Sequence, residues 1–362
     1  MLGQHAGIRT LPLVPVPRTE ALPLSYAQQR LWFLAQLEGS SAHYNMPLVL
    51  RLQGSLHPKA LIRSLETIVA RHESLRTRFV AIEGVAYQEI LEPDVFRVSE
   101  ESLLPGDDLR ALCNAEAWKA FDLSEAPLIR ARLLREADDS HVLLVTMHHS
   151  VSDGWSMQVF SRELLELYRA YSRGAENPLA PLAIQYADFA HWQRQWLVGA
   201  ELERQESYWR EQLSGLNAQL SLPADRPRPA VKTYHGAHVP VQGSRALLEQ
   251  VRSLSERAGV TVFMTLLSAF SVLLSRYSGE EDIAVGSPIA NRNRPEIEPL
   301  IGFFVNTLVL RTDVSGDPRF VELLGRVKEM ALGAYSHQDL PFERLLEIGR
   351  HFILLRRREE GI

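Results

Sequence analysis

Met147-His148-His149-Ser150-Val151-Ser152-Asp153-Gly154-Trp155-Ser156 has two adjacent histidines followed, after three residues, by an aspartate and a glycine. A chance match to H-H-x-x-x-D-G occurs in on the order of one chain in a thousand of this composition. The shorter pattern H-x-x-x-D carries little weight, because it arises by chance at roughly even odds in a chain of this length. The surroundings of the longer pattern therefore decide its meaning.

The histidine pair stands at a predicted strand-turn-helix junction. Residues 141–147 are mostly apolar, which is typical of a central strand buried on both faces. Residues 156–168 have helical periodicity. Side chains alternate along a strand, so we expect His148 and His149 to point to opposite faces. At most one of them is then available for chemistry.

Simpler interpretations of the same residues exist. A single histidine at a strand end is most often a hydrogen-bonded structural residue, and Asp-Gly before a helix commonly forms a turn and an N-cap. A zinc site is rejected, because the sole cysteine, Cys113, is remote in sequence and the histidines lack zinc-hydrolase spacing.

The composition is that of a globular protein with room for two lobes. The 362 residues are 46% hydrophobic and 23% charged. The net charge of −5 argues against nucleic acid as the main partner. One cysteine and a proline-bearing start without an apolar signal core predict a cytoplasmic protein. The longest apolar stretch, 260–274, is too short to span a bilayer and predicts a buried helix, so we expect no membrane partner.

Periodicity and turn residues predict alternating helices and strands. Ser25 and Gln28 match a capping box that opens a helix. The other predicted helices begin at Pro58 and cover 186–215, 246–258 and 261–277. The predicted strands are 47–52, a hairpin of 77–82 with 85–90, a hairpin of 128–134 with the histidine strand, 238–241, 282–285 and 306–311. The proline-rich segment 222–229 is predicted to connect the lobes.

Several separated segments resemble one family. They are SYAQQRLW at 25–32, RHESLRTRF at 71–79, the histidine segment, YADFAHW at 186–192, IGFFVNTL at 301–308 and HQDLPFE at 337–343. In this order they resemble the motifs of the condensation domain of nonribosomal peptide synthetases, most closely the subtype that takes L-configured donors. An epimerisation domain would need a second-lobe glutamate motif, and a heterocyclisation domain has aspartates in place of the histidines.

The resemblance implies an α/β (α+β) fold of two chloramphenicol-acetyltransferase-like lobes forming a V-shaped pseudo-dimer. We expect an N-terminal lead at 1–24, an N-terminal lobe at 25–177 and an incomplete C-terminal lobe at 178–348. Residues 349–362 form a tail without likeness to the family. Family members continue there with closing strands, so a truncated chain with unpaired sheet edges and exposed apolar surface is predicted.

The resemblance also implies site residues. His149 is the expected catalytic residue, as a general base or as a group that orients the attacking amine. His148, Asp153, Gly154 and Arg292 are expected to structure the loop, with Asp153 and Arg292 paired across the lobes. Gly154 also leaves room for close approach of the substrate. Three further residues are expected to position substrate: Trp155, Ser156 and Asn306. No metal is expected.

The implied reaction is amide-bond formation between a donor aminoacyl or peptidyl thioester and an acceptor aminoacyl amine, in biosynthesis of a peptide antibiotic or siderophore. Both substrates arrive on phosphopantetheine arms of carrier proteins, and no cofactor is bound by the domain itself. The first motif follows Met1 closely, so we expect the carriers to act in trans on a monomer. Two alternatives remain: a starter-type acyltransferase that uses acyl-CoA, and an inactive fragment that only binds carrier proteins.

Overall fold

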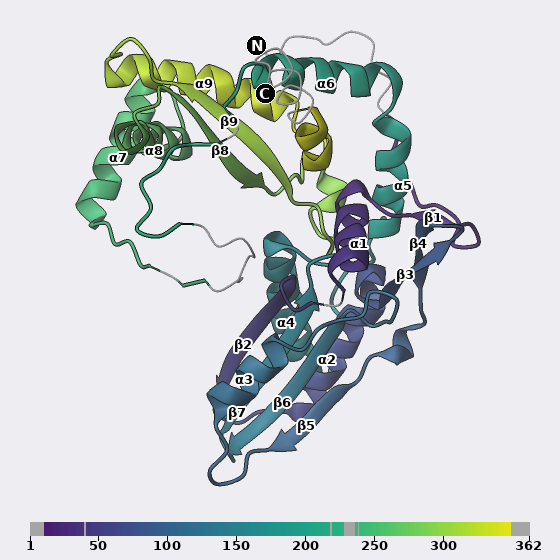
Figure 1. The fold of residues 1–362 in the computed structure, drawn as a ribbon. Helices are drawn as coiled ribbons and strands as arrows, with labels where there is room; N and C mark the ends of the chain where they lie inside the picture. The colour runs from purple at the N-terminus through teal and green to yellow at the C-terminus, as the bar shows by residue number, and fades with distance from the viewer. Residues whose placement is uncertain (1–10, 40, 218, 228–235, 238, 349–362) are drawn as a thin grey trace. The chain divides into compact units, whose positions relative to one another are not determined.

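The computed structural model describes residues 11–39, 41–217, 219–227, 236–237 and 239–348. Its contacts divide the chain into two compact units (Figure 1). Unit 1 contains the described residues up to Val198 together with Ala290–Val305. Unit 2 contains those of Gly199–Ile289 and those from Asn306 onward.

Unit 1 is built on a four-stranded sheet in the order β2-β7-β6-β5 (Figure 1). These strands are β2 (Asn45–Gln53), β7 (Ser140–His148), β6 (Ile129–Ala137) and β5 (Val98–Ser102). β7 pairs antiparallel with both neighbours, and β5 runs parallel to β6. β7 is therefore a central strand, as its apolar sequence predicts.

Both faces of β7 are covered. Leu143, Val145 and Met147 belong to the main core, which helices α2 (Pro58–Arg71) and α4 (Gly154–Tyr171) complete. Val142 and Leu144 instead pack with residues of α3 (Leu109–Ala117). The alternation along the strand thus separates two apolar layers, and it places consecutive residues at the strand end in different surroundings.

A second, three-stranded sheet has the order β1-β4-β3. The strands are β1 (Leu22–Pro23), β4 (Val85–Ile90) and β3 (Thr77–Ile82), and the predicted hairpin of β3 with β4 is confirmed. The predicted capping box of Ser25 and Gln28 opens α1 (Tyr26–Glu38). The described part of the N-terminal lead, from residue 11, belongs to unit 1, because Leu13 is buried in a cluster with residues of α5 (Tyr186–Trp196).

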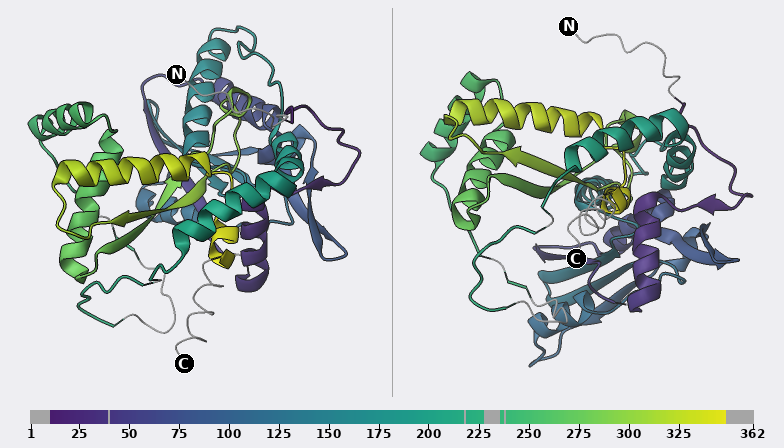
Figure 2. Two further views of the ribbon diagram at one scale, coloured as in Figure 1. Left: turned by 90° about the horizontal axis from the view of Figure 1, so that it is seen from above. Right: turned by 45° about the horizontal axis from the view of Figure 1, so that its top comes forward.

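Unit 2 contains one antiparallel strand pair, β8 (Asp282–Ile289) with β9 (Asn306–Asp313), among the residues described. Its labelled helices are α6 (Gly199–Leu213), α7 (Arg245–Ala258), α8 (Val262–Ser278) and α9 (Phe320–Ser336), and residues 342–348 are helical as well. Figure 2 shows α9 running alongside the strand pair. Leu308, Leu310, Leu323 and Val327 form the centre of a core separate from that of unit 1.

One face of α8 is buried, as expected for the predicted buried helix, but the other face is exposed and apolar. Phe263, Leu266, Phe270, Leu273 and Tyr277 are each 42–64% exposed and recur at alternating spacings of three and four residues. The prediction of exposed apolar surface in the second lobe agrees with this face. No single helix among those described is long and apolar enough to cross a membrane, and α7 with α8 passes that test only as a pair bent by 102°.

Three predictions of organisation differ from the structure. The units divide after Val198 and not after residue 177, and residues 290–305 join unit 1 because their buried side chains pack there. The single helix expected over 186–215 is two helices, α5 and α6, broken before Gly199, whose φ of +54° is left-handed. Residues 239–241 form no strand, and His238 and the tail at 349–362 lie outside the described residues.

Candidate functional site

The two histidines occupy different environments at the end of β7. His148 is the last residue of the strand and is 4% exposed, whereas His149 is half-buried in the turn before α4. The backbone N–H of His149 donates to the Tyr44 carbonyl at 2.8 Å. The ring of His148 makes edge contacts with Tyr44 and Phe121, and the ring of His149 contacts Phe303.

His149 has an imidazole nitrogen available for chemistry. Its Nδ1 lies 2.8 Å from the Ser152 carbonyl, and because a carbonyl only accepts, Nδ1 carries the proton. Neutral His149 therefore has its lone pair on Nε2, and no hydrogen bond within the described residues engages that atom. The Phe303 ring lies 4.6 Å from the imidazole, centroid to centroid, and limits its rotation.

His148 is a structural histidine. Its Nδ1 accepts the backbone N–H of Ser150 at 3.1 Å and lies 2.8 Å from the Ser150 hydroxyl. Burial, with smaller contributions from His149 and Arg130, lowers the pKa of His148 to about 3. The side chain is consequently neutral at physiological pH and serves as an acceptor that shapes the turn.

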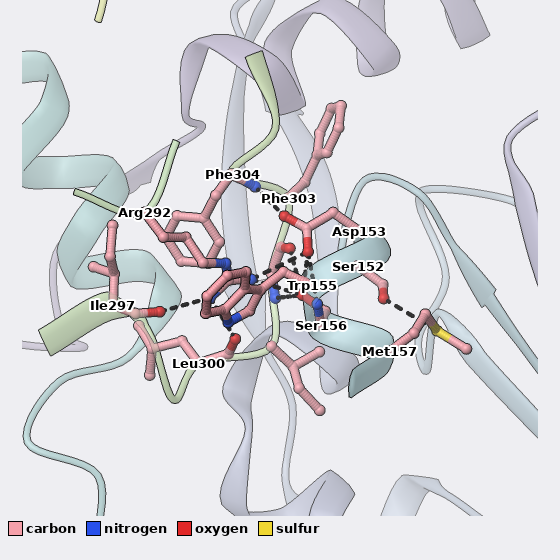
Figure 3. Close-up of polar contacts among 12 residues, drawn as sticks. Ser152, Asp153, Trp155, Ser156, Met157, Arg292, Ile297, Leu300, Phe303 and Phe304 are labelled. Atoms are coloured by element: carbon pink, nitrogen blue, oxygen red, sulfur yellow. Dashed lines mark hydrogen bonds and ion pairs between the residues drawn. The ribbon is translucent and has the colours of Figure 1, made fainter. Parts of the chain in front are cut away.

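Asp153 holds the turn by accepting several hydrogen bonds (Figure 3). It is the N-cap of α4, and its Oδ1 accepts both the N–H and the hydroxyl of Ser156 at 2.8 Å. The other oxygen, Oδ2, accepts the Phe304 N–H at 3.0 Å. Asp153 is wholly buried, so each of these bonds offsets the cost of removing a carboxylate from water.

Arg292 supplies the predicted counter-charge. Its Nη2 lies 3.1 Å from Asp153 Oδ1, and its Nη1 donates to the carbonyls of Ile297 and Leu300 (Figure 3). Burial lowers the pKa of Arg292, while Asp153 opposes that shift. Both partners belong to unit 1, which corrects the prediction of a pair across the two lobes.

Buried side chains form hydrogen bonds with every peptide unit of residues 301–304, which we call the clamped segment. His72 accepts the Ile301 N–H, and the Ser74 hydroxyl donates to the Ile301 carbonyl. Ser156 Oγ bonds both the N–H and the carbonyl of Gly302. The Tyr186 hydroxyl donates to the Phe303 carbonyl, and Asp153 accepts the Phe304 N–H. The clamped segment places the Phe303 ring in contact with the His149 ring.

Gly154 and Trp155 open α4 beside this network. A Cβ added to Gly154 would contact nothing within 4 Å, so the glycine leaves open space next to the motif. The Trp155 indole N–H donates to the Glu298 carbonyl at 3.0 Å, and the side chain stays 38% exposed. Trp155 therefore retains an accessible apolar surface, which suits its predicted role in substrate positioning.

Ser156 and Asn306 are placed differently from their predicted roles. Ser156 is completely buried, and its hydroxyl is occupied by Asp153, Arg292 and Gly302. Asn306 is in unit 2, where its amide donates to the Gln338 and Leu340 carbonyls and accepts the Phe342 N–H. The polar atoms of both side chains therefore have partners within the protein, and a role of either residue in substrate positioning stays a prediction.

Two residues missed as site residues are His72 and Tyr186. Both occur within the resembling segments, but nothing in the sequence pairs either of them with the clamped segment. His72 lies between Glu163 and Ile301, and the Tyr186 hydroxyl joins Ser25 to Phe303. Among the residues described, no cluster of three or more His, Cys, Asp or Glu side chains is arranged to hold a metal ion.

Comparison with known sequences gives one consistent result. The family model described as Condensation domain matches residues 18–352. The chain is 52% identical over 353 residues to a linear gramicidin synthase polypeptide of Brevibacillus parabrevis, covering 96% of this chain and 5% of that protein. It is 50% identical over 341 residues to malpinin synthetase of Mortierella alpina, covering 93% of this chain and 4% of that protein.

Solved structures agree with the sequence comparisons. The X-domain from teicoplanin biosynthesis has a TM-score of 0.85 and 32% identity, over 94% of this chain and 76% of that one. The same X-domain in complex with OxyB has a TM-score of 0.86. The first condensation domain of the CDA synthetase has a TM-score of 0.74 at 23% identity, over 90% of this chain and 78% of that one, which is a likeness of fold.

Proposed function

Because this chain belongs to the condensation domain family, we propose that it joins a donor acyl thioester to an acceptor amine through an amide bond. Condensation domains are amide-forming acyltransferases of synthetases that use phosphopantetheine carriers. The predicted α/β class and the likeness to chloramphenicol-acetyltransferase-type lobes accord with this family. The donor and acceptor reach this chain on separate carrier proteins, and the donor is L-configured.

The observation that carries the proposal is the free Nε2 of His149. The Ser152 carbonyl fixes the Nδ1–H tautomer, so Nε2 is left as an acceptor. An acceptor of this kind holds the amine in the orientation for attack or takes up its proton. Both roles need the same imidazole geometry, which the Phe303 contact preserves.

The reaction balances with one proton transfer. The acceptor nitrogen attacks the thioester carbonyl, a C–N bond forms, and the C–S bond breaks. The proton lost by the nitrogen ends on the departing phosphopantetheine sulfur, through His149 Nε2 if that atom acts as the base. The thioester is already activated, so alignment of the two substrates contributes much of the acceleration.

A second candidate function is a protein-binding module without chemistry. One similar solved structure is the complex of an X-domain with OxyB, so a domain of this fold binds a protein partner there. The His149 geometry favours catalysis in this chain, because pure recruitment requires no free imidazole nitrogen.

The test is amide formation by the purified chain with two separately loaded carrier proteins, followed by mass spectrometry of the acceptor arm. The proposal predicts an amide product from an L-aminoacyl donor and far less from its D-enantiomer. Acyl-CoA replaces the donor carrier in a parallel reaction, and efficient product formation there would favour a starter-type acyltransferase. Carrier binding without any product would favour the binding module.

A further inference from the structure

His72 is a buried histidine whose two ring nitrogens both have partners in the clamped network. It is 1% exposed, follows α2, and has its Nε2 2.8 Å from Glu163 Oε2 on α4. Its Nδ1 accepts the Ile301 N–H at 3.2 Å. The carboxylate fixes the proton on Nε2, which leaves the Nδ1 lone pair directed at the backbone of residue 301.

The neighbouring Ser74 completes the attachment of Ile301. Its hydroxyl donates to the Ile301 carbonyl at 2.7 Å, so residues 72 and 74 hold both polar groups of one residue. The Ile301 side chain is 1% exposed and packs in the main core of unit 1. Ile301 is therefore the fixed start of the clamped segment, two residues before Phe303.

We propose that His72 is a positioning residue for His149, which it acts on through Ile301 and the clamped segment that carries Phe303. This inference rests on the proposed function only for its effect on the rate of amide formation. A Phe303 ring 4.6 Å from the imidazole restricts the ring planes that His149 adopts. Release of Ile301 lets Phe303 shift, and a displacement of about 1 Å near a reacting group lowers rates by up to about a hundredfold.

The charges around His72 keep it in the accepting state. Glu163 faces its Nε2, Arg71 donates to the other oxygen of Glu163 at 3.1 Å, and Arg292 is a second positive charge that acts on His72. Burial, followed by repulsion from Arg71 and Arg292, lowers the pKa of His72 against the opposing effect of Glu163. A neutral ring is required, because a protonated Nδ1 would confront the Ile301 N–H donor.

Two near-isosteric substitutions separate the two bonds of His72. His72→Asn leaves an amide oxygen near the position of Nδ1 and so keeps an acceptor for Ile301, but loses the bond to Glu163. His72→Gln places its amide nitrogen near Nε2 and keeps the bond to Glu163, but loses the acceptor. Ser74→Ala removes the other attachment of Ile301 and gives an independent route to the same result.

The matched control is Tyr171→Phe. It deletes a hydroxyl that bonds Thr67 across the same α2–α4 interface at 3.0 Å, a bond that involves no residue of the clamped segment. Each variant is first checked for folding by circular dichroism and thermal unfolding. The primary readout is the ¹⁵N and ¹³C imidazole signal of His149, assigned among the 12 histidines by its loss in His149→Gln.

The positioning role predicts a shifted His149 signal and an at least tenfold lower rate of amide formation in His72→Gln and Ser74→Ala. His72→Asn and Tyr171→Phe should resemble the parent in both readouts. An unchanged His149 signal in folded His72→Gln or Ser74→Ala overturns the inference. A further outcome is that the parent forms no amide while the His149 signal still shifts in His72→Gln and not in His72→Asn. That outcome contradicts the proposed function and still supports the positioning role.

Discussion

Arg292 Nη2 lies 3.1 Å from Asp153 Oδ1, and the two side chains are 1% and 0% exposed. Both carboxylate oxygens of Asp153 accept hydrogen bonds, Oδ1 from Ser156 and Arg292 and Oδ2 from the Phe304 N–H. In Asp153→Asn, one of these oxygens becomes an N–H₂ group that faces another donor, and the buried guanidinium loses its counter-charge. We expect the free energy of unfolding to fall by about 3 kcal/mol, measured by urea denaturation.

The control for this substitution is Asp108→Asn. Asp108 is also an N-cap, of α3, and accepts the N–H groups of Arg110 and Ala111, but it is exposed. Its replacement should change the unfolding free energy by no more than about 0.5 kcal/mol, because Asn caps helices as well as Asp does. If Asp153→Asn is as stable as Asp108→Asn yet inactive, Asp153 has a chemical role that this account does not give it.

Gly302 is the point where the clamped segment is packed most tightly. An added Cβ would lie 2.1 Å from Tyr186 Cδ2 and 2.9 Å from Phe304 Cε2. Both rings are buried and cannot withdraw, so Gly302→Ala should cost at least about 3 kcal/mol of stability or prevent folding. The measurement is the thermal midpoint, or the soluble yield where no folded protein forms.

Gly325→Ala is the opposite case. Gly325 lies within α9, and a Cβ there meets nothing within 4 Å. Alanine should stabilise this helix by about 1 kcal/mol, because glycine is a poor helix former. Equal effects of the two substitutions would mean that the close packing at Gly302 does not constrain the clamped segment.

Stability should decline in mild acid. The folded-state pKa values of His72 and His148 lie below the ordinary value of 6.5, and that of His148 is about 3. Between the folded and unfolded pKa values the unfolded chain binds more protons. The stabilisation is therefore fully present above pH 6.5 and is lost as the pH falls below it, by up to about 1.4 kcal/mol per pH unit for each histidine.

His148→Asn tests the contribution of one of these two histidines. The variant keeps an acceptor for the Ser150 N–H but removes the titrating group. Urea midpoints at pH 7.5, 6.5 and 5.5 should fall less steeply for His148→Asn than for the parent. A parent whose midpoint is constant over this range would contradict the neutral, buried state of both histidines.

Much of the fold follows from local sequence. The capping box at Ser25, the hairpin at 77–90 and the buried histidine strand are predicted from residues close together in the sequence. The structure confirms all three. The break between α5 and α6 is a subtler local event at Gly199, within a polar-aromatic stretch that otherwise favours one helix. The assignment of residues 290–305 to unit 1 depends on packing between distant segments, which periodicity does not encode.

The candidate site shows the same division. The residue types in the histidine segment indicate one reactive and one structural histidine, and the different partners of His148 and His149 agree with that split. The internal hydrogen bonds of Ser156 and Asn306 could not be predicted. A sequence does not show whether a polar side chain is exposed or bonded within the protein. The link from His72 to Ile301 spans 229 residues and arises only from tertiary structure.

In the proposed reaction the free Nε2 of His149 takes part in amide formation. The most direct measurement is the single-turnover rate with loaded donor and acceptor carriers for the parent, His149→Ala and His191→Ala. His191 is a control histidine whose ring lies 2.7 Å from the side-chain amide of Gln195, one turn further along α5. Circular dichroism and thermal unfolding establish that all three proteins are folded.

We predict that His149→Ala loses at least about a hundredfold in rate, as expected when a group that handles a proton in the transition state is removed. His191→Ala should retain the parent rate. A folded His149→Ala protein that forms the amide as fast as the parent would contradict the account.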